Sequence, residues 1–258
     1  MDVSIIIPTF NEVENVVPLV QEIKANMPLS STYEIIVVDD DSPDGTIRAV
    51  EQAFPNDPSV VPLLRTHDRG LANSVRAGID KSSGDKILVM GADFTHDPRE
   101  ISPMLRVGEV YDIVIGSRFC AGGNMYSTTH YMLSLYYNRF ARVFLRTQVQ
   151  DNLGGYFTMP RAELYRLPFE KIFYGYGDYF FRLLHYAQRM NMSIVEVPAQ
   201  YQARRGGTSK SNFPKMLLSY SWAIGRLSSA MVSLKLESLV ARRKRKKAKQ
   251  EEALERPY

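Results

Sequence analysis

The sequence predicts an α/β domain with a mostly parallel, Rossmann-like sheet flanked by helices. Short apolar runs alternate with amphipathic stretches along the first half of the chain, and the connections between them are short. The expected strands are residues 3–7, 34–38, 60–64, 86–90, 112–116 and 194–197. The expected helices are residues 15–26, residues 71–81 and the stretch that follows the turn at residues 41–45. Sheets of this kind collect their ligands outside the carboxyl ends of the strands.

Length and composition are those of a globular protein with a sizeable core. The chain has 258 residues, of which 45% are apolar and 23% charged, so a collagen-like, disulfide-rich or wholly disordered protein is excluded. The single cysteine, Cys120, cannot form an internal disulfide, which fits a reducing compartment. The N-terminus is typical of a first strand rather than of a signal peptide. We expect a main domain at residues 1–215, a helix at 216–240 and a disordered tail at 241–258.

The net charge of +4 is concentrated at the C-terminus. Residues 242–258 hold eight basic and three acidic side chains, a net charge of +5, so the other 241 residues sum to −1. No apolar run reaches the roughly 18–20 residues that a membrane span needs. The nearest candidate lies between Lys215 and Lys235, and it contains Arg226 and five serines. We therefore expect no transmembrane helix in this chain.

Carboxylates and an arginine follow the ends of the expected strands. Asp39 and Asp40 follow the second strand, and Asp93 follows the fourth. Arg118 follows the fifth. Ribose hydroxyls and base N–H groups are donors that suit buried carboxylates, and Mg2+ or Mn2+ is typically held by one or two carboxylates plus phosphate oxygens. The pattern predicts a nucleoside diphosphate and a cation at this edge, unless residues 39–41 merely cap the next helix.

Several motifs together resemble the glycosyltransferases of family 2. The motifs are Ser4-Ile-Ile-Ile-Pro8-Thr9-Phe10-Asn11-Glu12, Val37-Val38-Asp39-Asp40-Asp41-Ser42-Pro43-Asp44-Gly45-Thr46 and Gly116-Ser117-Arg118. More narrowly, the turn at 42–46 and residues 205–210, Arg-Gly-Gly-Thr-Ser-Lys, are similar to those of the dolichol-phosphate mannose synthases. The resemblance covers roughly residues 2–215. It implies a GT-A fold, an inverting mechanism, a nucleotide-sugar donor, a polyprenyl-phosphate acceptor and Mg2+ or Mn2+ as cofactor.

The same resemblance implies roles for individual residues. Those expected around the nucleotide sugar are Pro8, Phe10, Glu12, Val37, Asp39, Asp40 and Asp93. Those expected at the metal are Asp93 and Thr95. Those expected at the acceptor phosphate are Arg118, His130, Ser134 and Arg205. Those expected to act in transfer are Asp93, Arg118, Arg204 and Lys210.

The chain departs from the pattern of that family in two places. The family usually has Asp-X-Asp after the fourth strand, whereas this chain has Gly91-Ala92-Asp93, and Thr95 stands where a glutamine often follows. We therefore expect weaker metal binding, unless Asp97 compensates. Further on, His130 stands where the family tends to have an arginine. A histidine binds phosphate only when it is protonated or has the right tautomer, so this substitution is not equivalent.

A phosphate acceptor poses an electrostatic problem rather than a proton-transfer problem. Its second pKa is near 6, so it is already anionic at neutral pH and needs no general base. Cations must position it against the charge of the donor, which favours arginines and lysines. The candidates are Arg118, Arg204, Arg205 and Lys210, with Gly206-Gly207 as a loop that closes over phosphate. The alternative is a solvated basic loop. Because Arg118 lies beyond a strand end, we expect it to contribute little to packing.

Two stretches are candidates for contact with a membrane surface. An apolar stripe at helical spacing precedes the basic run at residues 242–247, which is a two-signal arrangement for an anionic bilayer. The stripe is Leu217, Tyr220, Ile224, Leu227, Met231 and Leu234. Residues 130–146, with Arg139, Arg142 and Arg146 on one helical face, are either an acceptor-contacting interfacial helix or an ordinary amphipathic one. We expect peripheral binding at the cytoplasmic face of a membrane, with a small membrane-spanning subunit as a further candidate anchor, and no nucleic-acid partner.

Three functions remain open on the sequence alone. The first is transfer of mannose from GDP-mannose to dolichyl or undecaprenyl phosphate. The second is transfer to a sugar hydroxyl of a surface polysaccharide, which needs a general base, and Asp178 is the candidate. The third is a catalytically weakened relative that binds a nucleotide sugar without turnover, because Gly91 and His130 replace expected binding residues.

Overall fold

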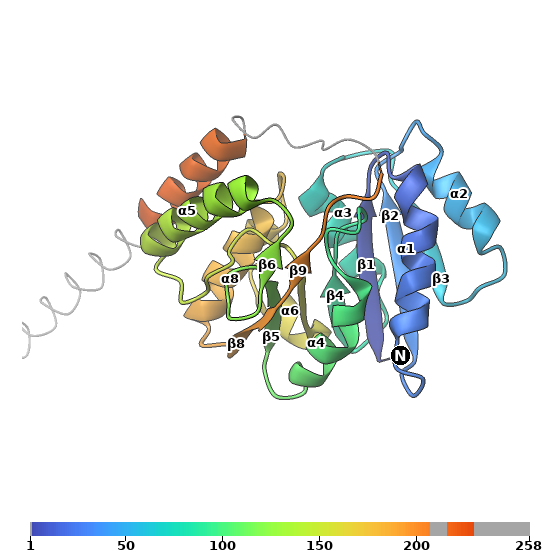
Figure 1. The fold of residues 1–258 in the computed structure, drawn as a ribbon, viewed down its shortest axis with the longest axis horizontal. Helices are drawn as coiled ribbons and strands as arrows, with labels where there is room; N and C mark the ends of the chain where they lie inside the picture. The colour runs from blue at the N-terminus through green and yellow to red at the C-terminus, as the bar shows by residue number, and fades with distance from the viewer. Residues whose placement is uncertain (1, 207–215, 230–258) are drawn as a thin grey trace, which may run out of the picture. The chain divides into compact units, whose positions relative to one another are not determined.

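A computed structural model describes residues 2–206 and 216–229 of the chain (Figure 1). The two stretches belong to separate compact units. In the second unit, residues 216–229 are helical, as the apolar stripe predicts. The remaining stripe residues, Met231 and Leu234, and the basic tail lie outside the described residues. None of the helices among the described residues is both long enough and apolar enough to cross a bilayer.

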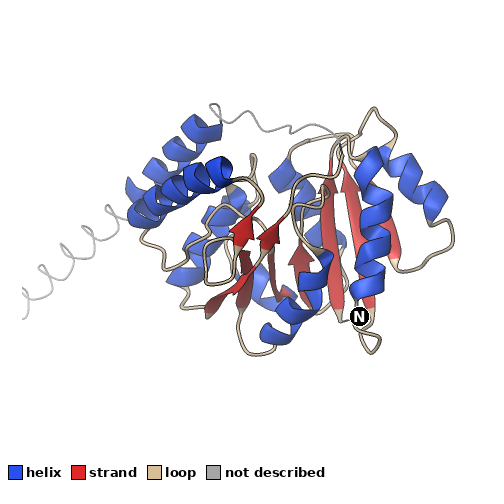
Figure 2. Ribbon diagram, in the orientation of Figure 1, coloured by secondary structure: helices blue, strands red, loops and turns tan. Residues whose placement is uncertain are grey.

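The first unit is built on a mixed sheet that is mostly parallel (Figure 2). Within the described residues it has seven strands in the order β3-β2-β1-β4-β7-β5-β8. They are β1 (Val3–Thr9), β2 (Tyr33–Asp39), β3 (Val60–Leu64), β4 (Lys86–Val89), β5 (Ile113–Ser117), β7 (Phe157–Pro160) and β8 (Ile194–Pro198). β7 is antiparallel to both of its neighbours, and the other neighbouring pairs are parallel. A small parallel sheet pairs β6 (Asn124–Met125) with β9 (Gln200–Tyr201).

Helices cover both faces of the larger sheet. They are α1 (Val13–Asn26), α2 (Thr46–Ala53), α3 (Leu71–Lys81), α4 (Ile101–Val107), α5 (Thr128–Leu145), α6 (Arg161–Arg166), α7 (Phe169–Ile172) and α8 (Tyr179–Arg189), with a 3-10 turn η1 (Pro98–Glu100) before α4. Alternate residues of a strand point to opposite faces. Ile5 and Ile7 of β1 therefore pack with α1, α2 and α4 in one core, and Ile6 packs with α3, α6, α7 and α8 in the other.

The order of the strands reverses between β1 and β4. From β1 the chain adds β2 and then β3 on one side, and it returns to pair β4 with the other side of β1. Parallel sheets bind ligands at such a switch point, just beyond the carboxyl ends of the two strands. The segments that follow β1 and β4 are therefore the first place to look for a site.

The expected strands and helices of the first half are confirmed, and so are the two later parallel strands. β7 was not expected. It is four residues long and lies between β4 and β5, which are themselves parallel. The expected helix at 130–146 is confirmed as α5.

Candidate active site

The segment after β1 is fixed by the turn that follows β2. The N–H of Asn11 donates to Oγ of Ser42 at 2.9 Å, and the N–H of Glu12 donates to Oγ1 of Thr46 at 2.9 Å. Two hydroxyls of the Ser-Pro-Asp-Gly-Thr turn thus accept the backbone N–H groups of Asn11 and Glu12, which lie beyond the end of β1 and outside its pairing with β2. This explains why a turn of that composition accompanies the motif after β1.

Asp39 ends β2 as a buried carboxylate with several donors. Its Oδ1 accepts hydrogen bonds from the hydroxyls of Thr9 at 2.9 Å and Ser42 at 2.5 Å, and its Oδ2 accepts the N–H of Ser42 at 2.9 Å. A carboxylate offers about four acceptor positions. Asp39 is therefore rigidly oriented at the carboxyl end of the sheet and retains capacity for a further donor.

Asp40 and Asp41 are engaged with the segment after β3. Asp40 is buried, forms an ion pair with Arg65 and accepts the N–H of Gly70 at 2.7 Å, while Asp41 forms an ion pair with Arg69. The N–H of Thr46 at the start of α2 donates instead to Asp44. The first N–H of α2 is thus bonded to Asp44, not to residues 39–41, which organise the sheet edge.

Three other residues expected at the nucleotide sugar differ in how far their side chains are exposed to solvent. Phe10 is 41% exposed directly after β1. Pro8 is half-buried opposite Val38 in the β1–β2 register. Val37 is fully buried in the core beside α1.

Asp93 lies beyond β4, in a segment whose backbone is turned by Phe94 at φ +63°. Its Oδ1 accepts the hydroxyl of Thr95 at 2.7 Å and the Thr95 N–H at 3.2 Å, and its Oδ2 accepts Nη2 of Arg204 at 2.6 Å. Burial by itself would raise the pKa of Asp93, but the Thr95 hydroxyl and the Arg204 guanidinium outweigh it and hold that pKa below its usual value. Asp93 is therefore ionised at neutral pH.

Arg204 joins the two sides of the switch point. One amino group lies 2.6 Å from Asp93 after β4, and the other lies 3.2 Å from Oε1 of the buried Glu12 after β1. Side chains that follow two strand ends thus form a binding site for positive charge, which the guanidinium occupies.

The same site, formed by Glu12 and Asp93, suits a divalent cation that binds together with a diphosphate. The carboxylates of Glu12 and Asp93 and the Thr95 hydroxyl offer oxygen ligands of the kind that Mg2+ and Mn2+ prefer. Mg2+ usually takes only one or two carboxylates beside phosphate oxygens. Among the described residues no group of three or more His, Cys, Asp or Glu side chains is placed to hold a metal alone. The donor set therefore fits a metal that shares its coordination with the phosphates of a ligand.

Gly91 occupies the position of the missing carboxylate. Its N–H donates to Nδ1 of His96 at 2.8 Å, and the imidazole stacks on Tyr156 at 4.6 Å. Burial lowers the pKa of His96 to about 4, so the ring is neutral and can accept this bond. A Cβ added at Gly91 would lie 3.4 Å from Oδ1 of Asp93 and 3.6 Å from Nδ1 of His96, which are ordinary contacts.

Gly91→Asp is therefore expected to fit and to tighten the binding of Mn2+ by about tenfold, because a second carboxylate would stand beside Asp93. Titration calorimetry with Mn2+ measures the change. Gly91→Asn is the matched control, since it adds nearly the same volume without charge. Equal affinity in the Asp and Asn variants would show that the metal binds elsewhere.

Arg118 is buried in an ion pair rather than exposed beyond its strand. Its Nε and Nη2 donate to the two oxygens of Asp151 at 2.8 and 2.7 Å, and its guanidinium lies 4.6 Å from the ring centre of Tyr201. Burial by itself would lower the pKa of Arg118, but the Asp151 carboxylate raises it above its ordinary value. The expectation that Arg118 contributes little to packing is wrong, because a bidentate partner 33 residues away draws it into the protein.

His130 and Ser134 lie one turn apart on α5. His130 is exposed in the first turn, where its N–H donates to Oγ of Ser127 at 3.4 Å, and the Ser134 carbonyl accepts Asn138 at 2.9 Å. The ring of Tyr131 lies 5.1 Å from that of Phe119, which links this end of α5 to the segment that follows Arg118.

Arg205 contacts α1 and the segment after β4. It forms an ion pair with Glu22, and its guanidinium lies 3.8 Å above the ring centre of Phe94. The following carbonyl, of Gly206, accepts Asn15 at 3.2 Å. Lys210 and Gly207 lie outside the described residues.

The two remaining carboxylates from the sequence are each committed to an arginine. Asp97 accepts Nε of Arg99 at 2.9 Å and forms an ion pair with that residue. Asp178 forms an ion pair with Arg182. Residues that the sequence did not single out include Asp151, His96 and Gln202. Arg118, Tyr156 and Asp97, which they contact, are distant from them in sequence.

Fold and site together define an α/β protein of the GT-A type, with carboxylates from β1, β2 and β4 at the switch point. The chain belongs to glycosyl transferase family 2, which it matches over residues 4–167. It is 33% identical to an undecaprenyl-phosphate mannosyltransferase of Micrococcus luteus, over 81% of this chain and 87% of that protein. A polyprenol monophosphomannose synthase of Mycolicibacterium smegmatis is 33% identical over 88% and 89% of the two chains. A dolichol-phosphate mannosyltransferase of Pyrococcus furiosus is 32% identical, and the match spans 81% of this chain and 59% of that protein.

Solved structures support the fold. Glucosyl-3-phosphoglycerate synthase from Mycobacterium tuberculosis, in complex with Mn2+, UDP-glucose and phosphoglyceric acid, aligns with a TM-score of 0.67 at 16% identity, over 88% of this chain and 80% of that one. The same enzyme with Mg2+ and UDP aligns with a TM-score of 0.63 at 17% identity, over 88% and 77%. At such identities the likeness extends to the GT-A fold alone.

Proposed function

We propose that this chain is an inverting glycosyltransferase that moves mannose from GDP-mannose to a polyprenyl phosphate. The observation that carries the proposal is the binding site for positive charge between Glu12 and Asp93, at the switch point of a family 2 domain. The names of three relatives, each a mannosyltransferase or mannose synthase for a polyprenyl phosphate, supply the sugar and the acceptor.

The donor would lie across the ends of β1, β2 and β4. Asp39, already oriented by Thr9 and Ser42, would accept a ribose or base donor, with Phe10 beside it. Asp93 and Thr95 would hold Mg2+ or Mn2+. The metal, when bound, offsets the charge of the diphosphate as it leaves. Arg204 is close enough to share that task, because it already neutralises the carboxylate of Asp93.

The acceptor phosphate would need only to be positioned by cations, since it is already an anion. Asp151 occupies Nε and Nη2 of Arg118, which leaves Nη1 as the amino group that Arg118 would offer. His130 and Ser134 on α5 would complete the phosphate site, with Arg205 and Lys210 as further cations. Transfer to a sugar hydroxyl fits less well, because its candidate base, Asp178, is held by Arg182.

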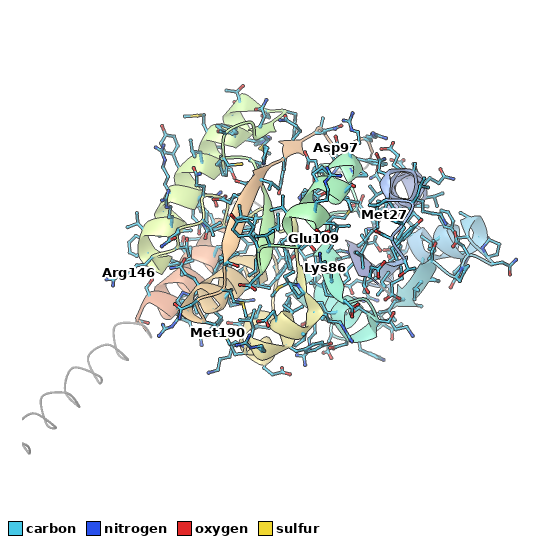
Figure 3. All side chains as sticks on the ribbon, turned by 90° about the horizontal axis from the view of Figure 1, so that it is seen from below. Met27, Lys86, Asp97, Glu109, Arg146 and Met190 are labelled. Carbon is cyan, nitrogen blue, oxygen red and sulfur yellow. The ribbon has the colours of Figure 1, made fainter. Side chains whose placement is uncertain are left out.

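The acceptor is a lipid, and α5 carries apolar side chains that face solvent. The exposed ones are Met132, Leu133, Tyr136, Phe140, Val143 and Phe144. Arg139 and Arg142 are exposed on the same helix, and Arg146 follows its end (Figure 3). An exposed apolar face with interspersed arginines suits the boundary between acyl chains and anionic headgroups. We therefore place α5 at the cytoplasmic face of the membrane, with the basic tail and a membrane-spanning subunit as additional anchors.

Replacing Tyr136 and Val143 together with glutamate is expected to weaken binding to anionic vesicles strongly, and the remaining binding, supplied by the basic tail, should be sensitive to salt. These side chains are 59% and 71% exposed, so the melting temperature should change little. Co-sedimentation with vesicles measures the binding. Val110→Glu is the matched control, because Val110 is 79% exposed away from α5. Wild-type binding by the double variant would remove α5 from the membrane contact.

A panel of donors and acceptors tests the function itself. GDP-mannose, GDP-glucose, UDP-glucose and UDP-galactose are each incubated with undecaprenyl phosphate, dolichyl phosphate or the corresponding free polyprenol, in Mg2+ or Mn2+. We expect product from GDP-mannose and the phosphates, and none from the free alcohols. Transfer to a hydroxyl acceptor would favour the polysaccharide enzyme, and GDP-mannose binding without any transfer would favour the catalytically weakened relative.

A further inference from the structure

Residues 199–206, here called the Arg204 segment, lie across the segment that follows β4. The backbone N–H of Gln202 donates to the carbonyl of Thr95 at 3.1 Å, and the N–H of Gln200 donates to Oε1 of Glu100 at 2.6 Å. Beyond these two bonds the guanidinium of Arg204 reaches Asp93. The position of Arg204 thus depends on these attachments and on those of Arg205 and Gly206 to Glu22, Phe94 and Asn15.

One side-chain contact strengthens the attachment of the Arg204 segment next to Thr95. Nε2 of Gln202 donates to Oδ2 of Asp97 at 2.7 Å, joining two residues that are 105 positions apart. Asp97 (labelled in Figure 3) is 5% exposed, and its Oδ1 accepts the N–H of Arg99 at 2.9 Å, which caps η1. Oδ1 therefore holds η1, and Oδ2 holds the Arg204 segment while it also accepts the Arg99 guanidinium.

Asp97 is held in place by a further partner: Nε of Arg99 donates to its Oδ1 at 2.9 Å, and the two side chains form an ion pair. Hydrogen bonds to a charged acceptor are stronger than neutral ones. Gln202 is also two residues before Arg204, and both side chains contact the segment after β4.

We propose that Asp97 and Gln202 are positioning residues that set the guanidinium of Arg204 against Asp93. Arg204 and a divalent cation are then alternative partners of the Asp93 carboxylate, and the Asp97–Gln202 hydrogen bond determines how strongly Arg204 competes. Loosening this hydrogen bond frees Asp93 for metal and at the same time misplaces a cation needed in transfer. The second effect rests on the proposed function, whereas the first does not.

Three variants test the hydrogen bond with Mn2+ alone as the probe. Gln202→Met removes the donor without adding charge, and Gln202→Glu sets two carboxylates face to face. Asp97→Asn combined with Gln202→Glu reverses donor and acceptor between the two residues and keeps the wild-type net charge. The introduced amide oxygen can still accept the N–H and Nε of Arg99, but the amide nitrogen cannot accept the bonds that Arg99 donates to Oδ2. Gln52→Glu, on the exposed surface of α2, is the control for added charge.

The free Mn2+ signal in electron paramagnetic resonance gives the affinity. We expect Gln202→Met and Gln202→Glu to bind Mn2+ about two- to tenfold more tightly than wild type, which is the range for one net hydrogen bond. Gln52→Glu should match wild type, and the double variant should lie closer to wild type than Gln202→Glu does. In the transfer assay the two single variants should lose about tenfold or more in kcat, as misplacement of a catalytic group does. Tighter metal with slower turnover is a pair of changes that general damage to the fold would not produce.

Unchanged or weaker Mn2+ binding in both single variants would overturn the proposal, and so would a double variant that behaves like Gln202→Glu. The metal titration contains no donor or acceptor, so it decides the competition between Arg204 and Mn2+ even if the protein transfers no mannose. Absence of transfer by wild type, with the Mn2+ results as expected, would instead count against the proposed function alone.

Discussion

Asp93→Ala is expected to reduce transfer by about 10²–10³-fold, the usual cost of removing one preorganised electrostatic group from an active site. Asp93 contacts Thr95 and Arg204, and Gly91 supplies no second carboxylate after β4. The remaining activity should no longer depend on the concentration of Mn2+. Initial rates across a Mn2+ titration measure both effects.

The folded state should tolerate this change. Arg204 is partly exposed, so it can be solvated when its partner is lost. Thr95→Ala is the graded comparison, because it removes the hydroxyl that orients Asp93 but leaves the carboxylate, and it should be affected less. Wild-type turnover and metal dependence in Asp93→Ala would show that the metal assignment is wrong.

Asp151→Ala is expected to lower the free energy of unfolding by about 3–5 kcal/mol, because it leaves the charge of Arg118 buried without its partner. The pair is closed by two hydrogen bonds, and both side chains are almost fully excluded from solvent. Urea unfolding measures the loss. The same logic predicts that Arg118→Ala loses stability as well as turnover, so its activity must be compared at a temperature where it remains folded.

A double variant separates the ion pair from the packing around it. Arg118→Met combined with Asp151→Leu removes both charges and keeps much of the volume, and replacement of buried pairs by apolar residues is often nearly neutral. The double variant should therefore be more stable than Asp151→Ala while remaining inactive. A loss below about 1 kcal/mol in Asp151→Ala would mean that Arg118 finds water or another partner.

The sheet could be predicted because its strands are recognisable from local sequence. Runs such as residues 34–38 are apolar on both faces, and helical stretches with short connections separate them, which is the pattern of a parallel sheet. β7 has no such signal. Its place between β4 and β5 depends on pairing with residues about 70 and 40 positions away, and periodicity in a short window contains no information about distant partners.

Part of the site could be predicted because it follows from the positions of the strand ends. Once the strand ends are known, a parallel sheet brings the segments after β1, β2 and β4 to one edge, and Glu12, Asp39 and Asp93 are all found there. What could not be predicted is which charges neutralise one another. Arg118 is drawn inward by Asp151, and Arg205 is held by Glu22 and Phe94. Such pairings depend on side-chain directions across distant elements.

The departure at Gly91 also takes a physical meaning from the structure. Glu12 and Asp93 share one guanidinium, so a positive charge between β1 and β4 is stabilised even where the first carboxylate of the family pattern is missing. The expectation of weaker metal binding follows from the same arrangement, because Arg204 occupies an oxygen of Asp93 that a metal would need.

The edge between β1 and β4 is expected to bind the diphosphate of the donor together with a divalent cation. The most direct test of this binding is the anomalous difference map of a crystal grown with Mn2+ and GDP. We expect a peak at coordination distance from an oxygen of Asp93, next to the diphosphate, and Arg204 displaced from that oxygen toward the phosphates. A bound GDP with no metal peak at Asp93, or a peak at another part of the chain, would contradict the account.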